Sequence, residues 1–287
     1  ETISPSLLRL DNDEILFFYD VQMDSEEDPS KMGDMHTYVC RSGDEGKTWT
    51  MQTCVGLFPG IVHSMPDKVV KLSGGRIIVP LESNWPLRGE RYVSLCFYSD
   101  NNGYSWSPSD IIDLGRDCTT EEPSVAELED GRLIMMLRSL KGYLAGSYSE
   151  DKGKTWSKPE LLKDLPAPGH GFAMVRIPNT ANLLVIYCHN LHSPWLAGGE
   201  KQPMVNVAQL ERPLGAIRAP LTTAVSQDGG KTWIHHRNIA ESPKDDYDDF
   251  GYPGVTWLED GKVGLINFHA RNGIRMAGIH VDWFYEK

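Results

Sequence analysis

A tyrosine, a glutamate and two arginines have the types and positions to act on an acidic ligand. Tyr252 and Glu122 each stand immediately before a predicted inner strand. A phenol with a pKa of about 10 is a weak nucleophile, but a neighbouring carboxylate can accept its proton. Arg138 and Arg218 interrupt apolar segments, and a guanidinium there can bind a carboxylate with two hydrogen bonds. The alternatives are that Tyr252 only caps its strand and that the arginines form structural ion pairs.

Three histidines could line the same cavity, because His63, His170 and His269 lie at or near the ends of predicted inner strands. Each could equally be a satisfied core or surface residue. No two histidines have the spacing of a zinc site, and no phosphate loop or Ser-His-Asp pattern occurs. We therefore expect neither a metal nor another cofactor.

A short motif is repeated four times and indicates how these residues are positioned. Residues 42–49, 99–106, 149–156 and 226–233 share the pattern S-x-(D/N)-x-G-x-(T/S)-W. In such a turn the Asp or Asn caps the backbone and the Gly supplies a positive φ. The Trp is expected to bury its ring between neighbouring sheets. These four motifs, called boxes below, are expected to serve folding rather than catalysis.

A second pattern accompanies the boxes. From each of several starting points a strand reaches a turn rich in Asp and Gly, and a more apolar strand follows; the starts are Pro5, Pro66, Pro123, Phe172 and Pro253. Four strands repeated at intervals of roughly 50 to 80 residues form the blade of a β-propeller. The sequence therefore predicts an all-β propeller that forms a single domain over residues 1–287.

Repeat symmetry places the residue just before each inner strand at one height around the propeller axis. These residues are Ser4, Met65, Glu122, Gly171 and Tyr252. The symmetry predicts that Glu122 and Tyr252 converge on one mouth.

Composition excludes several classes of partner. The 287 residues are 40% hydrophobic, and 28 Lys and Arg against 40 Asp and Glu give a net charge of −12. This charge argues against binding to nucleic acid and anionic membranes, and no apolar run is long enough to span a bilayer. The five cysteines are scattered without a C-x-x-C pair, so no disulfide framework is expected. A start at Glu1 suggests an excised or processed piece; compartment and oligomeric state stay open.

The boxes are identified as Asp-boxes, or bacterial neuraminidase repeats, and nearly the whole chain resembles the sialidase (neuraminidase) superfamily. Residues 122–138 resemble the stretch that holds a catalytic glutamate and an arginine of the substrate carboxylate clamp. Residues 218–226 resemble the stretch with another clamp arginine. The segment that starts at Tyr252 resembles the one that begins with the nucleophilic tyrosine, and residues 277–284 resemble the closing strand.

Two departures from the family pattern affect these expectations. Sialidases have six blades and open with an R-I-P stretch, whereas five repeats are recognised here. The segment around Ile3 resembles the second family blade, so the first blade, with its arginine and its general-acid aspartate, is expected to be missing. Alternatively Ile3 marks a degenerate R-I-P, and the acid comes from Asp20, Asp24, Asp28 or Asp34. The family's glutamate near the last inner strand is also replaced, since residues 267–269 read Asn-Phe-His.

The resemblance implies an exo-glycoside hydrolase that removes a terminal sialic acid or a related carboxylated sugar with retention of configuration. In it Tyr252 would be the nucleophile and Glu122 its base. The substrate-binding residues would be Arg138, Arg218, His63, His170 and His269. A carbohydrate is thus the expected partner. The alternatives are a lyase or hydrolase of uronic-acid glycans on the same fold, and a glycan-binding propeller without catalysis.

Overall fold

The computed structural model describes residues 2–24, 32–84, 91–116, 118–191, 204–207, 210–213, 217–243 and 248–286. In these ranges strands dominate, and the helical segments are two short 3-10 turns, η2 (Glu259–Gly261) and η3 (Val281–Tyr285). None of the described helices is long and apolar enough to cross a bilayer. The predicted all-β class is confirmed.

The chain packs as two compact units. Unit 1 comprises Glu1–Glu127, Gly131–Met135 and Ser147–Pro159, and unit 2 comprises Leu128–Asp130, Met136–Gly146 and Glu160–Lys287. The single-domain extent and the number of blades stay predictions.

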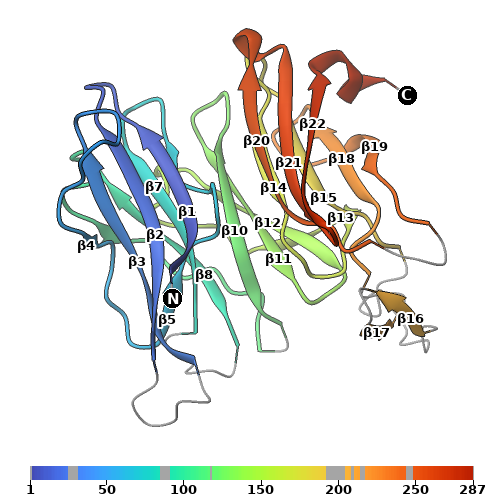
Figure 1. Ribbon diagram of the computed structural model, residues 1–287, viewed down its shortest axis with the longest axis horizontal. Helices are drawn as coiled ribbons and strands as arrows, with labels where there is room; N and C mark the ends of the chain where they lie inside the picture. The colour runs from blue at the N-terminus through green and yellow to red at the C-terminus, as the bar shows by residue number, and fades with distance from the viewer. Residues whose placement is uncertain are drawn as a thin grey trace. The chain divides into compact units, whose positions relative to one another are not determined.

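The main sheet of unit 1 contains two copies of the predicted repeat. Its order is β1-β2-β3-β5-β7-β8-β9, with β4 paired to β3 and β6 paired to β7. The strands are β1 (Thr2–Arg9), β2 (Ile15–Asp24), β3 (Met32–Ser42), β4 (Thr53–Cys54), β5 (Ile61–His63), β6 (Val70–Lys71), β7 (Ile77–Ser83), β8 (Val93–Ser99) and β9 (Ser107–Pro108). β5 joins the two copies, since it runs parallel to β3 and antiparallel to β7. Figure 1 shows β1, β2 and β3 side by side.

A four-stranded sheet of order β10-β11-β12-β13 contributes residues to both units. Its strands are β10 (Thr120–Glu127), β11 (Leu133–Ser139), β12 (Tyr143–Ser149) and β13 (Glu160–Pro166). As in much of the unit 1 sheet, strands that are consecutive in the chain are neighbours in this sheet.

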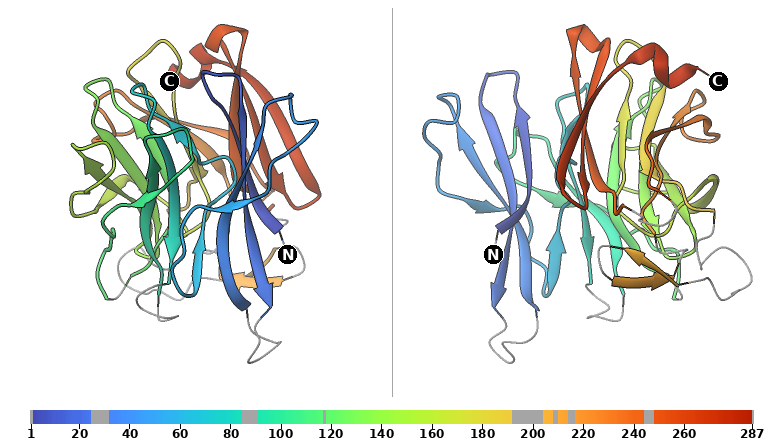
Figure 2. Two further views of the ribbon diagram at one scale, coloured as in Figure 1. Left: turned by 90° about the vertical axis from the view of Figure 1, so that its left-hand side faces the viewer. Right: turned by 45° about the vertical axis from the view of Figure 1, so that its right-hand side comes forward.

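Unit 2 contains a sheet of order β14-β15-β18-β19 and a three-stranded sheet of order β20-β21-β22. The strands are β14 (Ala173–Arg176), β15 (Leu183–Cys188), β18 (Leu221–Ser226), β19 (Ile234–Ala240), β20 (Gly251–Leu258), β21 (Val263–Ala270) and β22 (Gly273–His280). A separate hairpin, β16 (Met204–Val207) and β17 (Leu210–Pro213), is inserted between β15 and β18. Both views of Figure 2 include this two-stranded hairpin.

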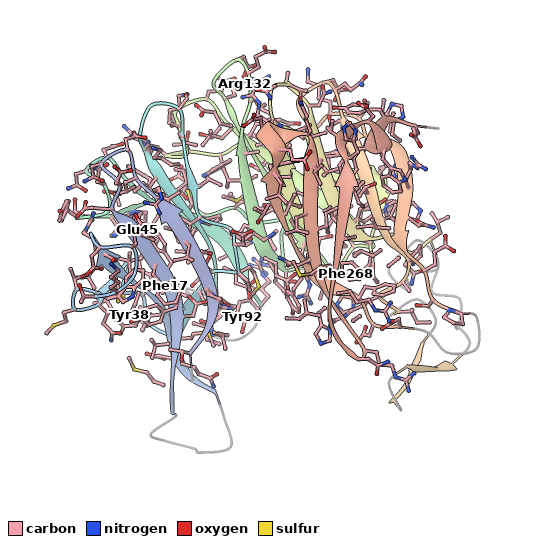
Figure 3. All side chains as sticks on the ribbon, turned by 45° about the horizontal axis from the view of Figure 1, so that its top comes forward. Phe17, Tyr38, Glu45, Tyr92, Arg132 and Phe268 are labelled. Carbon is pink, nitrogen blue, oxygen red and sulfur yellow. The ribbon has the colours of Figure 1, made fainter. Side chains whose placement is uncertain are left out.

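The second strand of each repeat contributes side chains to the core. Every residue of β7 and of β15 is buried, as expected for strands covered on both faces. One apolar cluster gathers side chains of β2, β7 and β8 in unit 1, and another gathers those of β15, β18 and β21 in unit 2. In the second cluster Phe268, labelled in Figure 3, packs edge-on against Phe250 with ring centroids 5.7 Å apart. Each fully buried Leu, Ile or Phe contributes about 1.5–3 kcal/mol.

The boxes form turns held by side chains rather than by backbone alone. In the first box Ser42 Oγ accepts the amide of Gly46 at 2.9 Å, and the Asp44 carboxylate accepts the amide and hydroxyl of Thr48 at 2.8 and 2.6 Å. The indole of Trp49 donates to the Gly46 carbonyl. The serine and Asp or Asn bonds recur in the other three boxes. The motif therefore forms the predicted capped turn.

The box tryptophans differ in burial, although the sequence predicts that each ring is buried between sheets. Trp233 is 3% exposed, whereas Trp49 is 39% exposed. The Trp49 ring packs on Phe17 of its own repeat, with centroids 5.6 Å apart (Figure 3 labels Phe17). The hydrogen bonds of the serine and aspartate, rather than indole burial, therefore define the turn.

The box glycines pack against the preceding repeat. A Cβ on Gly103 would lie 3.1 Å from a methyl carbon of Leu16 in β2, and a Cβ on Gly153 would lie 3.1 Å from Ile78 in β7. Both glycines also have a positive φ, which a side chain disfavours. Two constraints thus select glycine at these positions.

Arginines of the preceding repeat bind the same turns. Arg41 donates to the carbonyl of Asn102 at 2.6 Å, and Arg76 donates to the carbonyl of Lys152 at 2.9 Å. Each acceptor directly precedes its box glycine. The boxes therefore fasten consecutive repeats to one another.

Replacing the box aspartate is expected to destabilise the fold. Asp151→Ala should lower the unfolding free energy by about 1–2 kcal/mol, because the amide and hydroxyl of Thr155 lose their acceptor. Although burial opposes it, the bonds from Thr155 and Ser149 lower the pKa of Asp151 to about 2 from its usual 3.8. The stabilisation is therefore complete above pH 4 and lost as the pH falls towards 2. Urea unfolding checks this; the neighbouring Glu150→Ala is the control, and equal stability of both variants would contradict the role of the box.

Candidate functional site

Three of the predicted strand-start residues share an unusual backbone conformation. Ser4, Glu122 and Tyr252 have φ angles of 59°, 49° and 47°, and each directly precedes a proline. A left-handed conformation at a non-glycine residue costs about 1–3 kcal/mol and persists only where the surroundings enforce it. Met65 and Gly171 do not share this conformation, so the repeat equivalence holds locally for three of the five positions.

Tyr252 lies at the start of β20 and is 47% exposed, which leaves its side chain accessible. The pairing of β20 with β21 shifts register between Gly251 and Gly254, around Tyr252. Asn267, where the family pattern has a glutamate nearby, faces Gly254, because a Cβ there would lie 2.9 Å from the Asn267 side-chain oxygen. The bulge at Tyr252 thus depends on small neighbours.

Arg218 is brought beside the Tyr252 segment in unit 2. Its Nε lies 3.4 Å from Asp249 Oδ1, and its carbonyl accepts the amide of Phe250 at 3.1 Å. A Cβ on Gly251 would lie 3.4 Å from Arg218 Nη1. The guanidinium therefore lies close to the backbone that precedes the tyrosine.

The other predicted unit 2 residues lie on two further loops and strands. Arg138 is near the end of β11, and its Nε would lie 4.0 Å from a Cβ on Gly169, the residue before His170. His269 pairs with Gly251 across the β20–β21 hairpin and is exposed. Tyr252 and His269 thus lie at one end of the β20-β21-β22 sheet, Arg218 lies next to that end, and Arg138 lies beside Gly169 in the His170 loop.

In unit 1 a buried chain of polar groups leads to Glu122. The amide of Glu122 donates to Glu82 Oε2 at 2.6 Å, and the other oxygen of Glu82 lies 2.8 Å from His63 Nε2. His63 Nδ1 lies 3.1 Å from the Ser64 carbonyl and 3.7 Å from Asp20 Oδ2. Glu122, Glu82, His63 and Asp20 are all 9% exposed or less. The left-handed turn at Glu122 is therefore fastened to a buried carboxylate.

His63 is positively charged in this environment. Burial alone would lower its pKa, but the interactions with Asp20 and Glu82 outweigh burial and raise the pKa to about 10. A carbonyl and a carboxylate can only accept hydrogen bonds, so both ring nitrogens of His63 donate. The nearly inaccessible His63 neutralises buried carboxylates, and its predicted substrate contact stays a prediction.

Lys68 also lies within this part of unit 1. Its amide donates to Ser6 Oγ at 3.2 Å. Burial lowers the pKa of its ammonium group to about 8, while the charges of Glu122 and Asp67 act in the opposite direction. Glu122 thus has a buried cation in its electrostatic surroundings.

The four aspartates considered as the general acid lie in different environments. Asp20 is fully buried in β2, where its Oδ1 accepts the Thr37 hydroxyl at 2.5 Å. Asp24 ends β2, Asp34 is exposed in β3, and Asp28 lies outside the described residues. Asp20 therefore serves the buried network, and the source of a general acid stays open.

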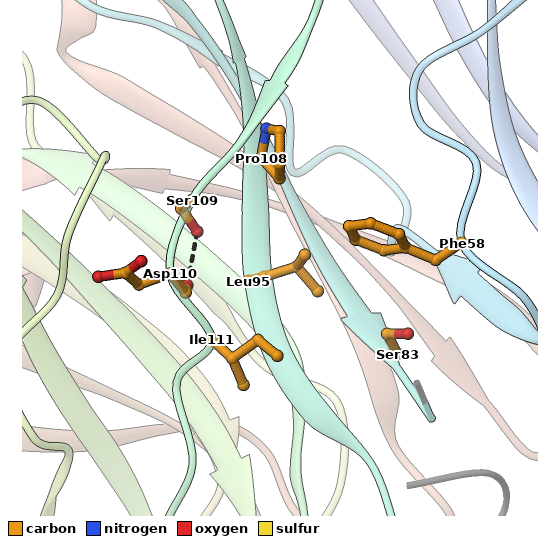
Figure 4. Close-up of a pocket in the computed structure, with 7 residues that line it drawn as sticks. All are labelled: Phe58, Ser83, Leu95, Pro108, Ser109, Asp110 and Ile111. Atoms are coloured by element: carbon orange, nitrogen blue, oxygen red, sulfur yellow. Dashed lines mark hydrogen bonds between the residues drawn. The ribbon is translucent and has the colours of Figure 1, made fainter. Parts of the chain in front are cut away.

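A cavity of about 510 Å³ in unit 1 has the wrong chemistry for an acidic ligand (Figure 4). Phe58, Leu95 and Ile111 give it apolar walls, and Asp110 is the one charged side chain among the described residues that line it. Within this described lining an anion would meet a carboxylate and no cation. Among the described residues no cluster of three or more His, Cys, Asp or Glu side chains could hold a metal.

Comparison with known proteins identifies the family. Residues 1–265 match a family model described as a BNR repeat-like domain. The chain belongs to this BNR repeat-like family. A sialidase of Micromonospora viridifaciens is 24% identical over 270 residues, which cover 89% of this chain and 37% of that protein.

Solved structures similar to this BNR repeat-like chain include sialidases. A Hadza microbial sialidase has a TM-score of 0.69 at 18% identity and covers 98% of this chain and 53% of its own. The intramolecular trans-sialidase of Ruminococcus gnavus has a TM-score of 0.66 at 15% identity, with 100% and 79% covered. The predicted sialidase-type β-propeller fold is confirmed. The chain spans between 28% and 39% of the length of the curated relatives it matches.

Sequence reasoning missed several residues of these clusters. Glu82 lies near the end of the apolar strand β7, and only the pairing of His63 with Glu82 between β5 and β7 brings the two together. Asp249 stands in an acidic run, in which nothing marks it as the partner of Arg218. The pattern that could have indicated Glu82 is an acidic residue in an otherwise buried strand.

Removing the His63 charge is expected to lower the unfolding free energy by an amount that depends on pH. His63→Gln should lower the unfolding free energy by about 3–5 kcal/mol at pH 6, because buried Asp20 and Glu82 lose their cation. The folded-state pKa is raised above the usual 6.5, so this contribution is present below pH 6.5 and disappears as the pH approaches 10. Urea unfolding at pH 6, 8 and 10 measures the difference. The exposed His280→Gln is the control, and a difference independent of pH would refute a charged His63.

Proposed function

We propose that this chain is the propeller of a sialidase-like glycoside hydrolase that acts on glycans with a terminal sialic acid or a related carboxylated sugar. Membership of the BNR repeat-like family and the sialidase names of its relatives support this class. The observation that carries the proposal is the placement of a guanidinium, Arg218, against the backbone of an accessible, left-handed Tyr252 segment.

Tyr252 is proposed as the nucleophile. An anionic sugar repels a carboxylate, whereas a neutral phenol can approach the anomeric carbon, and sialidases are a recognised tyrosine exception among glycosidases. Attack forms a glycosyl–tyrosine bond as the leaving-group bond breaks, and water then releases the sugar. Two inversions give net retention. Glu122 is proposed to accept the phenol proton, a role that rests on its equivalent position in the repeat.

Arg218 and Arg138 are proposed to bind the sugar carboxylate. The Asp249 carboxylate lies 3.4 Å from Arg218 Nε and orients the guanidinium, and Arg218 Nη1 lies close to Gly251. A planar guanidinium held in this way can meet a carboxylate with two parallel hydrogen bonds. His63, His170 and His269 are proposed to contact other parts of the sugar. Of these, His63 belongs to the buried network described above.

Removing the phenol oxygen tests the mechanism directly. Tyr252→Phe should reduce kcat for an aryl sialoside at least about a thousandfold, because no oxygen remains to form the covalent bond. The melting temperature should be unchanged. Tyr104→Phe, at a tyrosine that is 71% exposed, is the matched control and should retain full activity.

The products also separate the proposal from its rivals. Near-normal hydrolysis by Tyr252→Phe would exclude the tyrosine mechanism. An unsaturated product that absorbs in the ultraviolet, formed from a uronic-acid glycan, would instead indicate a lyase. Binding of glycans without turnover would indicate a non-catalytic propeller.

Shortening the guanidinium should weaken recognition of the carboxylate. Arg218→Lys keeps the charge but loses the planar pair of donors, so kcat/KM for the sialoside should fall roughly ten- to a hundredfold. Steady-state kinetics measure this. Arg176→Lys is the comparison, because Arg176 donates to the Thr180 carbonyl within its own hairpin. Equal kcat/KM values for the two variants would count against Arg218 as a substrate ligand.

A further inference from the structure

A second cavity, of about 360 Å³, lies in unit 2 next to Arg218 along the chain. Ala219 and Pro220 form part of its wall, and Leu191, which is 65% exposed, forms its rim. The polar lining comes from His189, Asn190, Thr222, His236 and Asn238. A volume near 300 Å³ is at the small end of small-molecule pockets, so the cavity suits a ligand of about one ring.

The polar groups of this cavity are engaged in an internal network. The Thr222 hydroxyl lies 2.7 Å from Asn238 Oδ1, to which it donates, and Asn238 Nδ2 donates to Glu241. Asn190 Nδ2 donates to the Ile217 carbonyl at 3.0 Å. Among the described residues that line the cavity there is no Asp, Glu, Lys or Arg. This lining contrasts with Arg218 beside it and favours an uncharged ligand.

Hydrogen bonds indicate which nitrogen of His189 carries the proton. His236 Nε2 lies 3.1 Å from the Trp233 carbonyl, which can only accept, so the ring donates from Nε2. With that proton on Nε2, the other nitrogen, Nδ1, accepts the Tyr187 hydroxyl at 3.2 Å. The Tyr187 oxygen lies 2.5 Å from His189 Nδ1 and, with its own hydrogen used, must accept from it.

This relay leaves His189 Nε2 as an unprotonated acceptor. Burial, together with the neighbouring His236, lowers the pKa of His189 to about 4, so the ring is neutral at pH 7. Tyr187 remains protonated because burial raises the pKa of its phenol. A neutral imidazole in a small cavity can accept a hydrogen bond from a hydroxyl group.

We propose that this cavity is a binding site for an uncharged sugar ring, one of whose hydroxyl groups donates to His189 Nε2. Leu191, Ala219 and Pro220 offer apolar surface to the C–H face of the ring. The choice of a sugar rests on the proposed function, in which a neutral sugar is joined to the acidic one. The acceptor nitrogen itself follows from the Trp233–His236–Tyr187–His189 relay.

Nitrogen NMR on the full chain tests the proposal with methyl β-D-galactoside as the probe. Long-range proton–nitrogen spectra at pH 7 should show His189 protonated at Nδ1, and the probe should shift its Nε2 resonance. His189→Phe, which keeps an aromatic ring, should weaken probe binding roughly three- to tenfold, the value of one hydrogen bond. A His189 protonated at Nε2, or a probe that leaves the resonance unmoved, would overturn the proposal without requiring any variant to fold.

Two controls separate this site from the proposed enzyme. His235→Asn removes the adjacent histidine, which contacts Tyr285, and retains a residue that tolerates the φ of 55°; probe binding should be unchanged. Arg218→Lys should weaken binding of free sialic acid but not of the galactoside. If the galactoside binds at His189 while sialosides are neither bound nor cleaved, the proposed function fails and the site stands. If sialosides are cleaved but the probe does not shift the His189 resonance, the proposed function stands and this binding site fails.

Discussion

A left-handed residue directly before a proline is the constraint on which the candidate site depends. This backbone occurs at Ser4, Glu122 and Tyr252, each the second or third residue of its strand, and there it interrupts the regular alternation of side chains between the two faces of a sheet. The conformation is costly, and each instance has its own support. The Glu122 amide is held by Glu82, and the register shift of β20 accommodates Tyr252. The strain is thus stored where chemistry is expected, which is a common property of functional sites.

Electrostatics works at two ranges in this protein. The net charge of −12 repels an anionic sugar at long distance, although salt screens this field beyond about 8–10 Å. At short range, cations are held in sheltered positions by carboxylates, as His63 is by Glu82 and Asp20 and as Arg218 is by Asp249. Such pairing keeps a cation fixed in orientation, so the proposed binding of an acidic sugar would depend on local geometry rather than on the overall field.

The sequence allowed the prediction of features that short segments determine. The box turns, the apolar second strands and the special position of Tyr252 and Glu122 follow from local patterns and from their repetition. Contacts made by the irregular segments between these elements could not be predicted from local patterns. β5 has no periodic signal, yet its pairing places His63 opposite Glu82. Likewise the His189 relay joins residues from β15, β19 and the loop after β15, and no spacing in the sequence reveals that Tyr187 links two imidazoles.

The packing of the box glycines Gly103 and Gly153 against the preceding repeat has a consequence for how such a chain can change over evolutionary time. Gly103 rests on Leu16 and Gly153 on Ile78, and Arg41 and Arg76 clasp the same turns. Because the contacts between neighbouring repeats are made by equivalent residues, duplication or loss of a whole repeat would preserve matching contacts on either side. A break inside a repeat would leave one side of these contacts without its partner. The unit that can be duplicated or lost therefore extends from one box to the next.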